Sequence, residues 1–347
     1  MKIGLTYDLR SEYLNMGYSE EATAELDKEE TIAGIENALQ SLGYETERIG
    51  HVRQLMQQLL NGSRWDLVFN ICEGIYGDGR ESMVPALLDH WQIPYVFSGP
   101  ATLAMGLDKA ICKRLVRDAG LPTPAFAVVH SIGELDNPKP PFPLFIKPVS
   151  EGTGKGIDNH SLVRNESQYR QVTTRLLTEF HQPVLIESYL PGREFTVGIV
   201  GNGKQATVIG VMEVLINSRD EKIYSYSNKE NYETTVHYQS IHGQLYWKCA
   251  DLALLIWDSM GANDAGRIDI KLNASGEPEF MEINPLAGLN LHHSDLPILS
   301  RLNGISFEEL IEMIMHAAHS RLQMNSPLID QVKKVEQSQK NRFPASL

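Results

Sequence analysis

Polar residues alternate with aliphatic ones in two short strands of a predicted hairpin, and their types suit metal and phosphate chemistry. In the first strand Arg267, Asp269 and Lys271 share one face, and in the second strand Glu282 and Asn284 share one face. Carboxylate and amide oxygens are ligands for Mg²⁺ or Mn²⁺, not for zinc. The hairpin is therefore the first candidate for a reactive site.

The expected hairpin spans residues 265–284 and brings the two sets of side chains together. With its turn centred on the Ser-Gly step, Asp269 faces Glu282 and Arg267 faces Asn284. Two carboxylates directly opposite each other repel unless a proton or a cation lies between them. A solvated hairpin face with ordinary charges is the alternative interpretation. The short apolar strands and the proline after Asn284 favour the metal site.

A glycine-rich loop after a predicted strand at 144–149 is the second candidate. Lys147 lies in that strand, and Gly152, Gly154 and Gly156 follow in the loop. Glycines let backbone N–H groups surround phosphate oxygens, and a lysine adds a positive charge. The loop lacks the Gly-Lys-Ser/Thr sequence of a Walker A motif. A flexible turn without a ligand is the alternative.

A third candidate is the turn Pro191-Gly192, which follows an apolar strand and is flanked by Glu187 and Glu194. A strand that leads into a turn offers backbone groups to a purine, and an acidic side chain can accept hydrogen bonds from ribose hydroxyls. Solvated glutamates around a turn are the ordinary alternative.

The elements that must position these residues predict an α/β protein. The first hundred residues alternate strands and helices, which is typical of a parallel sheet. Strands are expected at 2–7, 44–49, 65–71 and 93–97, with helices around 84–88 and after a capping box of Asp27 and Glu30. A single helix is expected at 101–119, before the Gly120-Leu-Pro-Thr-Pro124 breaker.

The second half of the chain predicts more strands and fewer helices. Strands are expected at 184–189, 195–200 and 207–216, and helices at 166–180, 245–260 and 306–320. The polar, tyrosine-rich block 217–243 is too long for a turn and is expected to be a functional loop. We expect four parts: a domain at 1–100, a central part at 101–183, a part with the hairpin at 184–325, and a loose tail at 326–347.

Composition limits the class of protein. The chain has 31 Lys and Arg against 44 Asp and Glu, a net charge of −13, so a nucleic-acid partner is not expected. No run approaches the roughly 18 apolar residues of a membrane span, and no secretory signal is recognised. Three cysteines without metal-type spacing, Cys72, Cys112 and Cys249, indicate reduced thiols and a cytoplasmic protein.

Five short motifs occur in one order within residues 1–320. They are Leu107-Asp-Lys-Ala110, Lys147-Pro with Glu151-Gly-Thr-Gly154, Glu187 with Pro191-Gly-Arg-Glu194, Gly266-Arg-Ile-Asp269, and Glu282-Ile-Asn284. Together they resemble the ATP-grasp superfamily, and most closely the D-alanine–D-alanine ligase family. The resemblance implies an N-terminal parallel α/β domain followed by two ATP-grasp lobes, which would be the central part and the hairpin part.

The resemblance also implies a function. It is that of an ATP- and Mg²⁺- or Mn²⁺-dependent ligase, with two metal ions, that joins small amino acids such as D-alanine through an acyl phosphate. In this family the product serves peptidoglycan and hence cell-wall biosynthesis, and a homodimer is common. The partners are small amino-acid substrates, without nucleic acid or membrane.

The resemblance carries over to individual positions of this chain. The implied ATP-binding residues are Lys109, Lys147, Glu151, Gly152, Thr153, Gly154, Glu187, Tyr189, Leu190 and Glu194. The implied metal ligands are Asp269, Glu282 and Asn284. The implied catalytic residues are Arg267, Thr153 and Lys229, and the implied substrate contacts are Glu73, Lys229, Gly288 and Ser294.

Two departures from the family pattern bear on the substrate. Glu73 stands where the family has a histidine, and Glu230 replaces a tyrosine after Lys229. A buried carboxylate near the substrates would disfavour a substrate carboxylate and favour an ammonium or another basic group. The family's glutamate for the first substrate's ammonium corresponds to one of five residues: Glu20, Glu21, Glu25, Glu29 or Glu30.

Two other functions stay open. One is an ATP-grasp ligase for an L-amino acid or a specialised peptide, and the other is a nucleotide-binding regulatory module without catalysis. The set of Arg267, Asp269, Glu282 and Asn284 argues against the regulatory module, because a protein that only binds nucleotide needs no second metal carboxylate.

Overall fold

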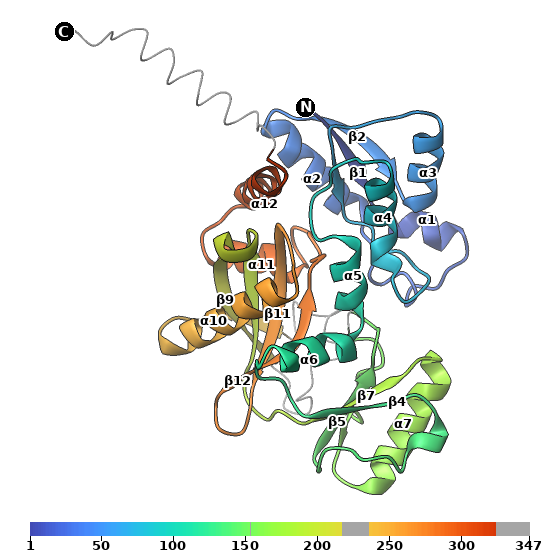
Figure 1. Cartoon of the computed structure of the whole chain (residues 1–347), viewed down its shortest axis with the longest axis vertical. Helices are drawn as coiled ribbons and strands as arrows, with labels where there is room; N and C mark the ends of the chain where they lie inside the picture. Colours follow the sequence, from blue (N-terminus) through green and yellow to red (C-terminus); the bar gives the residue numbers. More distant parts are fainter. Residues whose placement is uncertain (153, 217–235, 324–347) are drawn as a thin grey trace, which may run out of the picture.

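The computed structural model describes residues 1–152, 154–216 and 236–323. Its elements form three groups along the long axis of the molecule (Figure 1). The N-terminal group lies at one end, a second group with α7 lies at the other end, and the sheet that contains β11 and β12 lies between them. Helices α5 and α6 lie between the N-terminal group and the group with α7.

The N-terminal group is built on a three-stranded parallel sheet, as the alternation of strands and helices predicted. Strand β1 (Lys2–Thr6) lies between β2 (Glu45–Gly50) and β3 (Leu67–Asn70). Its helices are α1 (Arg10–Asn15), α2 (Glu29–Ser41), α3 (Val52–Leu60) and α4 (Met83–His90). The strand expected at 93–97 is reduced to one parallel bridge between Tyr95 and Val68.

The start of α2 differs from the expectation. Its N-cap is Lys28, without a side-chain cap, so the capping box of Asp27 and Glu30 is wrong. The Asp27 carboxyl hydrogen-bonds to Thr31 instead and lines a pocket. The helix does bury the apolar face that its periodicity predicted.

The single helix expected at 101–119 is also wrong. The chain forms α5 (Pro100–Leu107) and α6 (Lys109–Asp118), with Asp108 extended between them. The Asp108 carboxylate accepts a hydrogen bond from the backbone N–H of Ile111 at 2.8 Å, which caps α6. The break sets Lys109 at the first position of α6, where its side chain is buried.

The central part contains a four-stranded antiparallel sheet in the order β4-β7-β5-β6, covered by α7 (Glu166–Phe180). Its strands are β4 (Phe126–Val129), β5 (Leu144–Pro148), β6 (Leu162–Val163) and β7 (Val184–Ser188). Because β7 pairs with β4 and β5, a division of the chain at residue 184 would separate this strand from its sheet.

The remaining lobe is a five-stranded antiparallel sheet in the order β10-β9-β8-β11-β12. Its strands are β8 (Glu194–Val200), β9 (Thr207–Ile216), β10 (Val236–Ser240), β11 (Ala265–Leu272) and β12 (Pro278–Asn284). Its helices are α10 (Gln244–Ser259), α11 (Asp295–Leu302) and α12 (Phe307–Leu322), and short 3-10 helices lie at Arg80–Ser82 (η1), Ile132–Glu134 (η2) and Gly203–Gln205 (η3).

The block 217–243 was expected to be a loop, and this is wrong for residues 236–240, which form β10 against β9. Residues 217–235 and the expected tail at 326–347 lie outside the described residues.

The N-terminal group and the five-stranded lobe share one hydrophobic core, which includes side chains from β1, α2, α11 and α12. A buried ion pair adds to this contact: Arg321 of α12 lies 2.7 Å from Asp264, which also accepts a hydrogen bond from the backbone N–H of Phe97. The N-terminal group is therefore held against the lobe that carries the hairpin.

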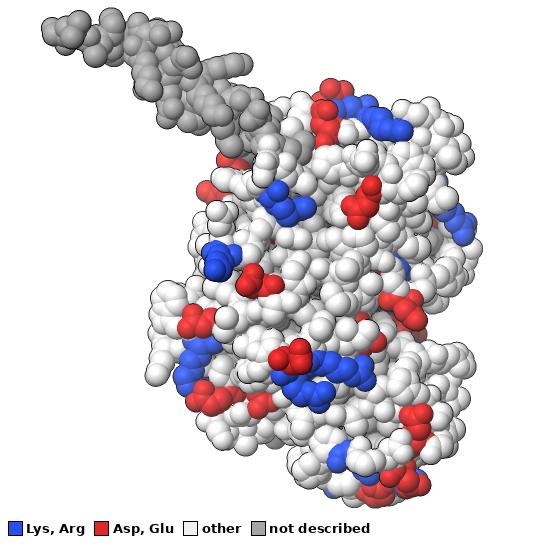
Figure 2. Space-filling model, viewed as in Figure 1, with Lys and Arg blue, Asp and Glu red and all other residues white. Residues whose placement is uncertain are grey.

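On the face in Figure 2, acidic and basic side chains lie in small mixed groups over all three parts. The three cysteines are buried and unbridged. Among the described helices, none is both long and apolar enough to span a membrane.

Candidate active site

The hairpin formed by β11 and β12 places the expected side chains opposite each other. Asp269 pairs with Glu282 and Arg267 pairs with Asn284, as predicted. Beyond Asp269 the register shifts, so that Ile270 pairs with Phe280. The pairing expected from the turn is therefore wrong for the residues nearest the turn, which pair one position off. A bulge at Met281 corrects this offset, so that Asp269 and Arg267 pair as expected.

The two facing carboxylates are partly neutralised by the protein itself. The Asp269 carboxylate accepts hydrogen bonds from Arg267 at 2.5 Å, Asn284 at 3.3 Å and Thr196 at 2.9 Å. The Lys109 ammonium lies 3.5 Å from Glu282. Asp269, Glu282 and Asn284 offer oxygen donors from two adjacent strands, and this donor set fits Mg²⁺.

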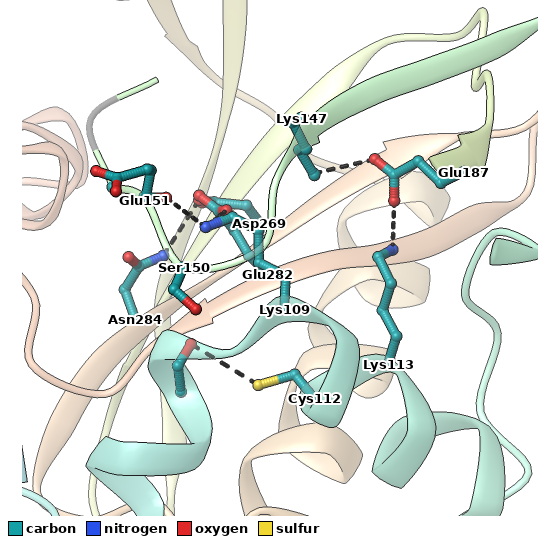
Figure 3. A network of polar contacts seen from close by, with 12 residues as sticks. Lys109, Cys112, Lys113, Lys147, Ser150, Glu151, Glu187, Asp269, Glu282 and Asn284 are labelled. Atoms are coloured by element: carbon teal, nitrogen blue, oxygen red, sulfur yellow. Dashed lines mark hydrogen bonds and ion pairs between the residues drawn. The ribbon is translucent and has the colours of Figure 1, made fainter. Parts of the chain in front are cut away.

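Lys109 connects the hairpin to the glycine-rich loop (Figure 3). Its Nζ donates to the backbone oxygen of Glu151 at 2.5 Å, while the same ammonium faces Glu282. The Lys109 side chain is only 10% exposed. The lysine that begins α6 therefore touches both the loop and the hairpin.

A buried triad holds the second lysine of the cleft. Figure 3 shows Glu187 between Lys147, at 3.0 Å, and Lys113, at 2.9 Å. Burial by itself would raise the pKa of Glu187, but the two ammonium groups outweigh it and the pKa is lowered. Burial lowers the pKa of Lys113. Sequence reasoning missed Lys113, although its position four residues after Lys109 puts both on one helix face.

The residues expected around a nucleotide line one cleft between the two antiparallel sheets. The described members are Lys109, Lys147, Glu151, Gly152, Gly154, Glu187, Tyr189, Leu190 and Glu194. Glu194 forms an ion pair with Lys271 at 2.8 Å. Thr153 lies outside the described residues.

A second pocket adjoins this cleft and extends to the N-terminal group; because expected substrate contacts line it, we call it the amino-acid pocket. The two share Lys109, Glu151, Gly152, Arg267, Glu282 and Asp295 in their walls. Of the expected substrate contacts, the amino-acid pocket is lined by Glu73, Gly288 and Ser294. Lys229 and Glu230 lie outside the described residues.

Gly288 and Ser294 lie side by side in the amino-acid pocket. A Cβ atom at Gly288 would come within 2.7 Å of the Ser294 Oγ. Glycine at this position therefore lets the Ser294 hydroxyl lie against the backbone of residue 288. Ser294 is the N-cap of α11, and its Oγ accepts from the backbone N–H of Asn290 at 3.0 Å.

Of the five N-terminal glutamates, Glu25 is the one that lies in the amino-acid pocket. Its carboxylate lies 2.8 Å from Arg80 and 3.0 Å from Lys155, and it accepts from the backbone N–H of Gly152 at 3.2 Å. Glu25 therefore links the N-terminal group to the glycine-rich loop.

The other four glutamates point elsewhere. Glu29 and Glu30 have side chains that are 60% and 51% exposed, and Glu20 and Glu21 lie on the surface.

Two acidic residues of the site were not predicted. Asp295 at the start of α11 lies 3.2 Å from Arg267, in the wall of both pockets. Glu81 of η1 hydrogen-bonds to Glu73 and is buried in the amino-acid pocket. Burial, together with the neighbouring carboxyl groups, raises the pKa of Glu73 well above its ordinary value, and burial raises the pKa of Glu81 to about 8.

Two antiparallel sheets that enclose a lysine-lined cleft above a carboxylate hairpin define a protein of the ATP-grasp class. The family model described as "D-ala D-ala ligase C-terminus" matches residues 115–316. The chain belongs to the D-alanine–D-alanine ligase family.

Relatives of this family cover most of the chain. The D-alanine–D-alanine ligase of Cupriavidus pinatubonensis is 28% identical over 297 residues, which cover 84% of this chain and 88% of that protein. The uncharacterized protein y4sG of Sinorhizobium fredii is 31% identical over 260 residues, or 74% of this chain and 75% of that protein.

Solved structures show the same fold. The D-alanine–D-alanine ligase of Bacillus anthracis complexed with ATP matches with a TM-score of 0.67 at 22% identity, covering 92% of this chain and 97% of that one. The VanG D-Ala:D-Ser ligase of Enterococcus faecalis matches with a TM-score of 0.68 at 19% identity, covering 91% and 99%.

Proposed function

We propose that the protein is an ATP- and Mg²⁺-dependent ligase that forms a peptide bond between two small amino acids. The carboxylate of the first amino acid attacks the γ-phosphorus of ATP, and ADP leaves. The amine of the second amino acid then attacks the acyl phosphate, loses a proton, and phosphate departs. Membership of the ligase family and the match to relatives named D-alanine–D-alanine ligase support this reaction.

The junction of the two pockets is the observation that carries the proposal. Arg267, Lys109 and Glu282 lie in the walls of both the nucleotide cleft and the amino-acid pocket. A γ-phosphate at this junction would meet an amino-acid carboxylate without either leaving its own pocket. Such positioning accounts for much of the rate of phosphoryl transfer.

The lysines of the cleft would hold the phosphate oxygens. Lys147 is oriented by Glu187, and Lys109 by the backbone oxygen of Glu151, so both cations are fixed before ATP binds. We assign Glu187 to this positioning and not to the ribose, because its side chain is only 1% exposed. Glu194, which is ion-paired to Lys271, would accept from the ribose hydroxyls.

Asp269, Glu282 and Asn284 would hold the metal ions. A bound Mg²⁺ supplies positive charge to phosphate oxygens as they are transferred. Arg267 would stabilise negative charge on the acyl phosphate and on the tetrahedral species. Asp295 and Asp269 orient its guanidinium, at 3.2 and 2.5 Å.

Gly288 and Ser294 would receive a substrate carboxylate at the start of α11. Backbone N–H groups at a helix N-terminus, together with a serine hydroxyl, suit a carboxylate. Glu25 is the residue that we assign to the first substrate's ammonium. The catalytic roles of Thr153 and Lys229 stay predictions.

The cellular setting follows from the substrates. An enzyme that consumes ATP and free amino acids would work in the cytoplasm, and a D-alanyl dipeptide would serve peptidoglycan synthesis. A homodimer, common in the family, is expected.

Product analysis tests the function. The purified protein is incubated with ATP, Mg²⁺ and pairs of D- or L-amino acids, and phosphate release and dipeptide mass are measured. We expect a dipeptide in a one-to-one ratio with released phosphate. Failure of every pair to give an ATP-dependent amide would overturn the proposal.

The Arg267→Lys variant is the matched comparison in this assay. It keeps the charge but loses the planar guanidinium that Asp295 and Asp269 orient. We expect slower turnover without a comparable loss of ATP binding.

A further inference from the structure

Four carboxyl groups in the amino-acid pocket lie close enough to influence one another: Glu25, Asp27, Glu73 and Glu81. Glu25 is neutralised by Arg80 at 2.8 Å and by Lys155 at 3.0 Å. Within the described ranges, no lysine, arginine or histidine lies within ion-pair distance of the other three carboxyl groups. Asp27, Glu73 and Glu81 therefore lack the direct neutralisation that Glu25 has, although Arg10, Lys28, Lys109 and Arg267 also line the pocket.

Glu81 is the most informative of these residues. Its side chain lines the amino-acid pocket but is only 9% exposed, and its carboxyl hydrogen-bonds to that of Glu73. Two carboxyl groups can form this bond only if one of them keeps a proton. A buried acid pair of this kind offers a place for a cation.

A ligand ammonium or guanidinium suits this place better than a metal ion. A Mg²⁺ ion needs about six ligands in near-octahedral geometry, and the acid pair supplies only its two carboxyl groups. An ammonium or guanidinium needs only hydrogen-bond acceptors, and it can donate to both Glu73 and Glu81 at once.

We infer that, in the proposed ligase reaction, one amino-acid substrate carries a second cationic group on its side chain, which binds between Glu73 and Glu81 in place of their shared proton. The charges agree with this assignment. Over the whole lining of the pocket, seven carboxyl groups stand against five Lys and Arg side chains, an excess of two negative charges: Glu25, Asp27, Glu73, Glu81, Glu151, Glu282 and Asp295 against Arg10, Lys28, Arg80, Lys109 and Arg267. The α-ammonium and α-carboxylate of an amino acid cancel, so only an amine or guanidine on its side chain reduces this excess.

Isosteric substrate pairs test the inference, which rests on the proposed function. Ornithine is compared with norleucine, and 2,4-diaminobutyrate with norvaline, as D- and L-enantiomers, with ATP and Mg²⁺. We expect at least one basic amino acid to exceed its neutral isostere tenfold or more in kcat/KM. If every neutral isostere is the better substrate, the inference is overturned while the proposed function stands. If no pair forms an ATP-dependent amide, the proposed function itself fails.

The Glu81→Gln variant assigns the preference to the acid pair. We expect it to lower the ratio of kcat/KM for the basic over the neutral amino acid by about tenfold or more. Glu21→Gln, a change on the surface of the same N-terminal group, is the control and should leave the ratio unchanged. An unchanged ratio in Glu81→Gln would overturn the inference.

Proton release gives a readout that does not depend on turnover. Calorimetry in buffers of different ionisation heat measures the protons released when each amino acid binds in the presence of Mg²⁺ and a non-hydrolysable ATP analogue. At pH 7 we expect the basic amino acid to release more protons than its isostere in the parent protein, and not in Glu81→Gln. Equal release in the parent would contradict the displacement of a shared proton.

Discussion

The two pockets that meet at the hairpin differ in how their buried carboxyl groups are neutralised. In the nucleotide cleft the carboxylates have lysine partners: Glu187 has Lys113 and Lys147, and Glu194 has Lys271. In the amino-acid pocket Glu25 has Arg80 and Lys155, but Glu73 and Glu81 contact each other, carboxyl to carboxyl.

The difference shows what each pocket is prepared to bind. Lysines held by carboxylates are fixed in position, so an anionic ligand such as a triphosphate meets cations that need little reorganisation. Carboxyl groups that share a proton instead accept a ligand that brings its own positive charge. The same residue type, glutamate, thus orients cations in one pocket and would bind a cation in the other.

The strongest test of the nucleotide cleft is Glu187→Gln. The variant leaves Lys113 and Lys147 buried without their common counter-ion. Breaking a buried ion pair by removing one partner costs about 3–5 kcal/mol, so the free energy of unfolding should fall by this amount in urea denaturation.

Glu194→Gln is the matched control for that experiment. Its pair with Lys271 is more exposed, at 26% and 18% of the two side chains. Ion pairs in contact with solvent contribute about 1 kcal/mol or less. If both variants lost the same free energy of unfolding, burial would not increase the contribution of the Glu187 triad to stability.

The junction between the pockets is tested by Glu282→Gln. Loss of one metal-facing carboxylate should lower kcat by about 10²-fold or more at saturating Mg²⁺, because a metal ion contributes several kcal/mol to transition-state stabilisation. The ligand-free variant should melt no lower than the parent, since Glu282 faces Asp269 and the loss of one carboxylate relieves their repulsion.

Glu279→Gln, on the same strand but outside both pockets, should keep the parental rate. A near-normal rate in Glu282→Gln would show that Glu282 is not a metal ligand.

Lys147→Met tests whether the cleft recognises an anion. The loss of a buried, charge-assisted hydrogen bond of about 1.5–3 kcal/mol should weaken the binding of an ATP analogue roughly 10- to 150-fold in calorimetry. Amino-acid binding should change much less. Lys139→Met, whose ion pair with Glu166 lies outside both pockets, is the control. Unchanged nucleotide affinity would contradict the phosphate-binding role of Lys147.

Much of the nucleotide cleft could be predicted from the sequence because its residues follow local rules. The period of two in β11 and β12 placed Arg267 and Asp269 on one face, and the pairing with Asn284 and Glu282 followed from one hairpin. The bulge at Met281 could not be predicted, because no glycine or other local signal marks it.

The errors in the fold have comparable physical causes. The apolar pattern of 101–119 continues across Asp108, so periodicity alone missed a break that depends on one capping side chain. Strand β10 does alternate in burial, but it is only five residues long, follows a long polar stretch and lies at the edge of its sheet, where pairing with β9 stabilises it.

The amino-acid pocket was harder to predict because its residues come together only in the folded chain. Glu25 was one of five equal candidates until α1, η1 and the glycine-rich loop were placed around it. Glu81 gave no signal, since a glutamate after an arginine in a loop is ordinarily solvated. Its contact with Glu73 depends on the turn through Gly74, which has a φ of +69° and which a Cβ atom would bring within 2.9 Å of the Arg80 backbone oxygen.

The smallest expected effect concerns the pH dependence of stability in the amino-acid pocket. The pKa of Glu81 is about 8 in the folded protein against 4.5 ordinarily, because burial disfavours its charged form. A raised carboxyl pKa gives stability that is complete below pH 4.5 and is lost as the pH rises through 8. The melting temperature of the parent should therefore fall between pH 5.5 and pH 8.5.

Glu81→Gln cannot ionise at this position, so its melting temperature should fall less over the same interval. The difference should be several degrees, because each unit of pKa shift corresponds to about 1.4 kcal/mol, and about 1 kcal/mol shifts the melting temperature of a large domain by about 2–4 °C. Burial, and to a lesser extent Asp8, raises the pKa of Asp27 to about 7. The melting temperature of the variant should therefore still depend on pH, but less than that of the parent. Glu21→Gln should follow the parent at every pH. If the melting temperature of Glu81→Gln depended on pH as that of the parent does, the Glu81 carboxyl would already be neutralised by another group. The two pockets would then not differ in how they neutralise buried carboxyl groups.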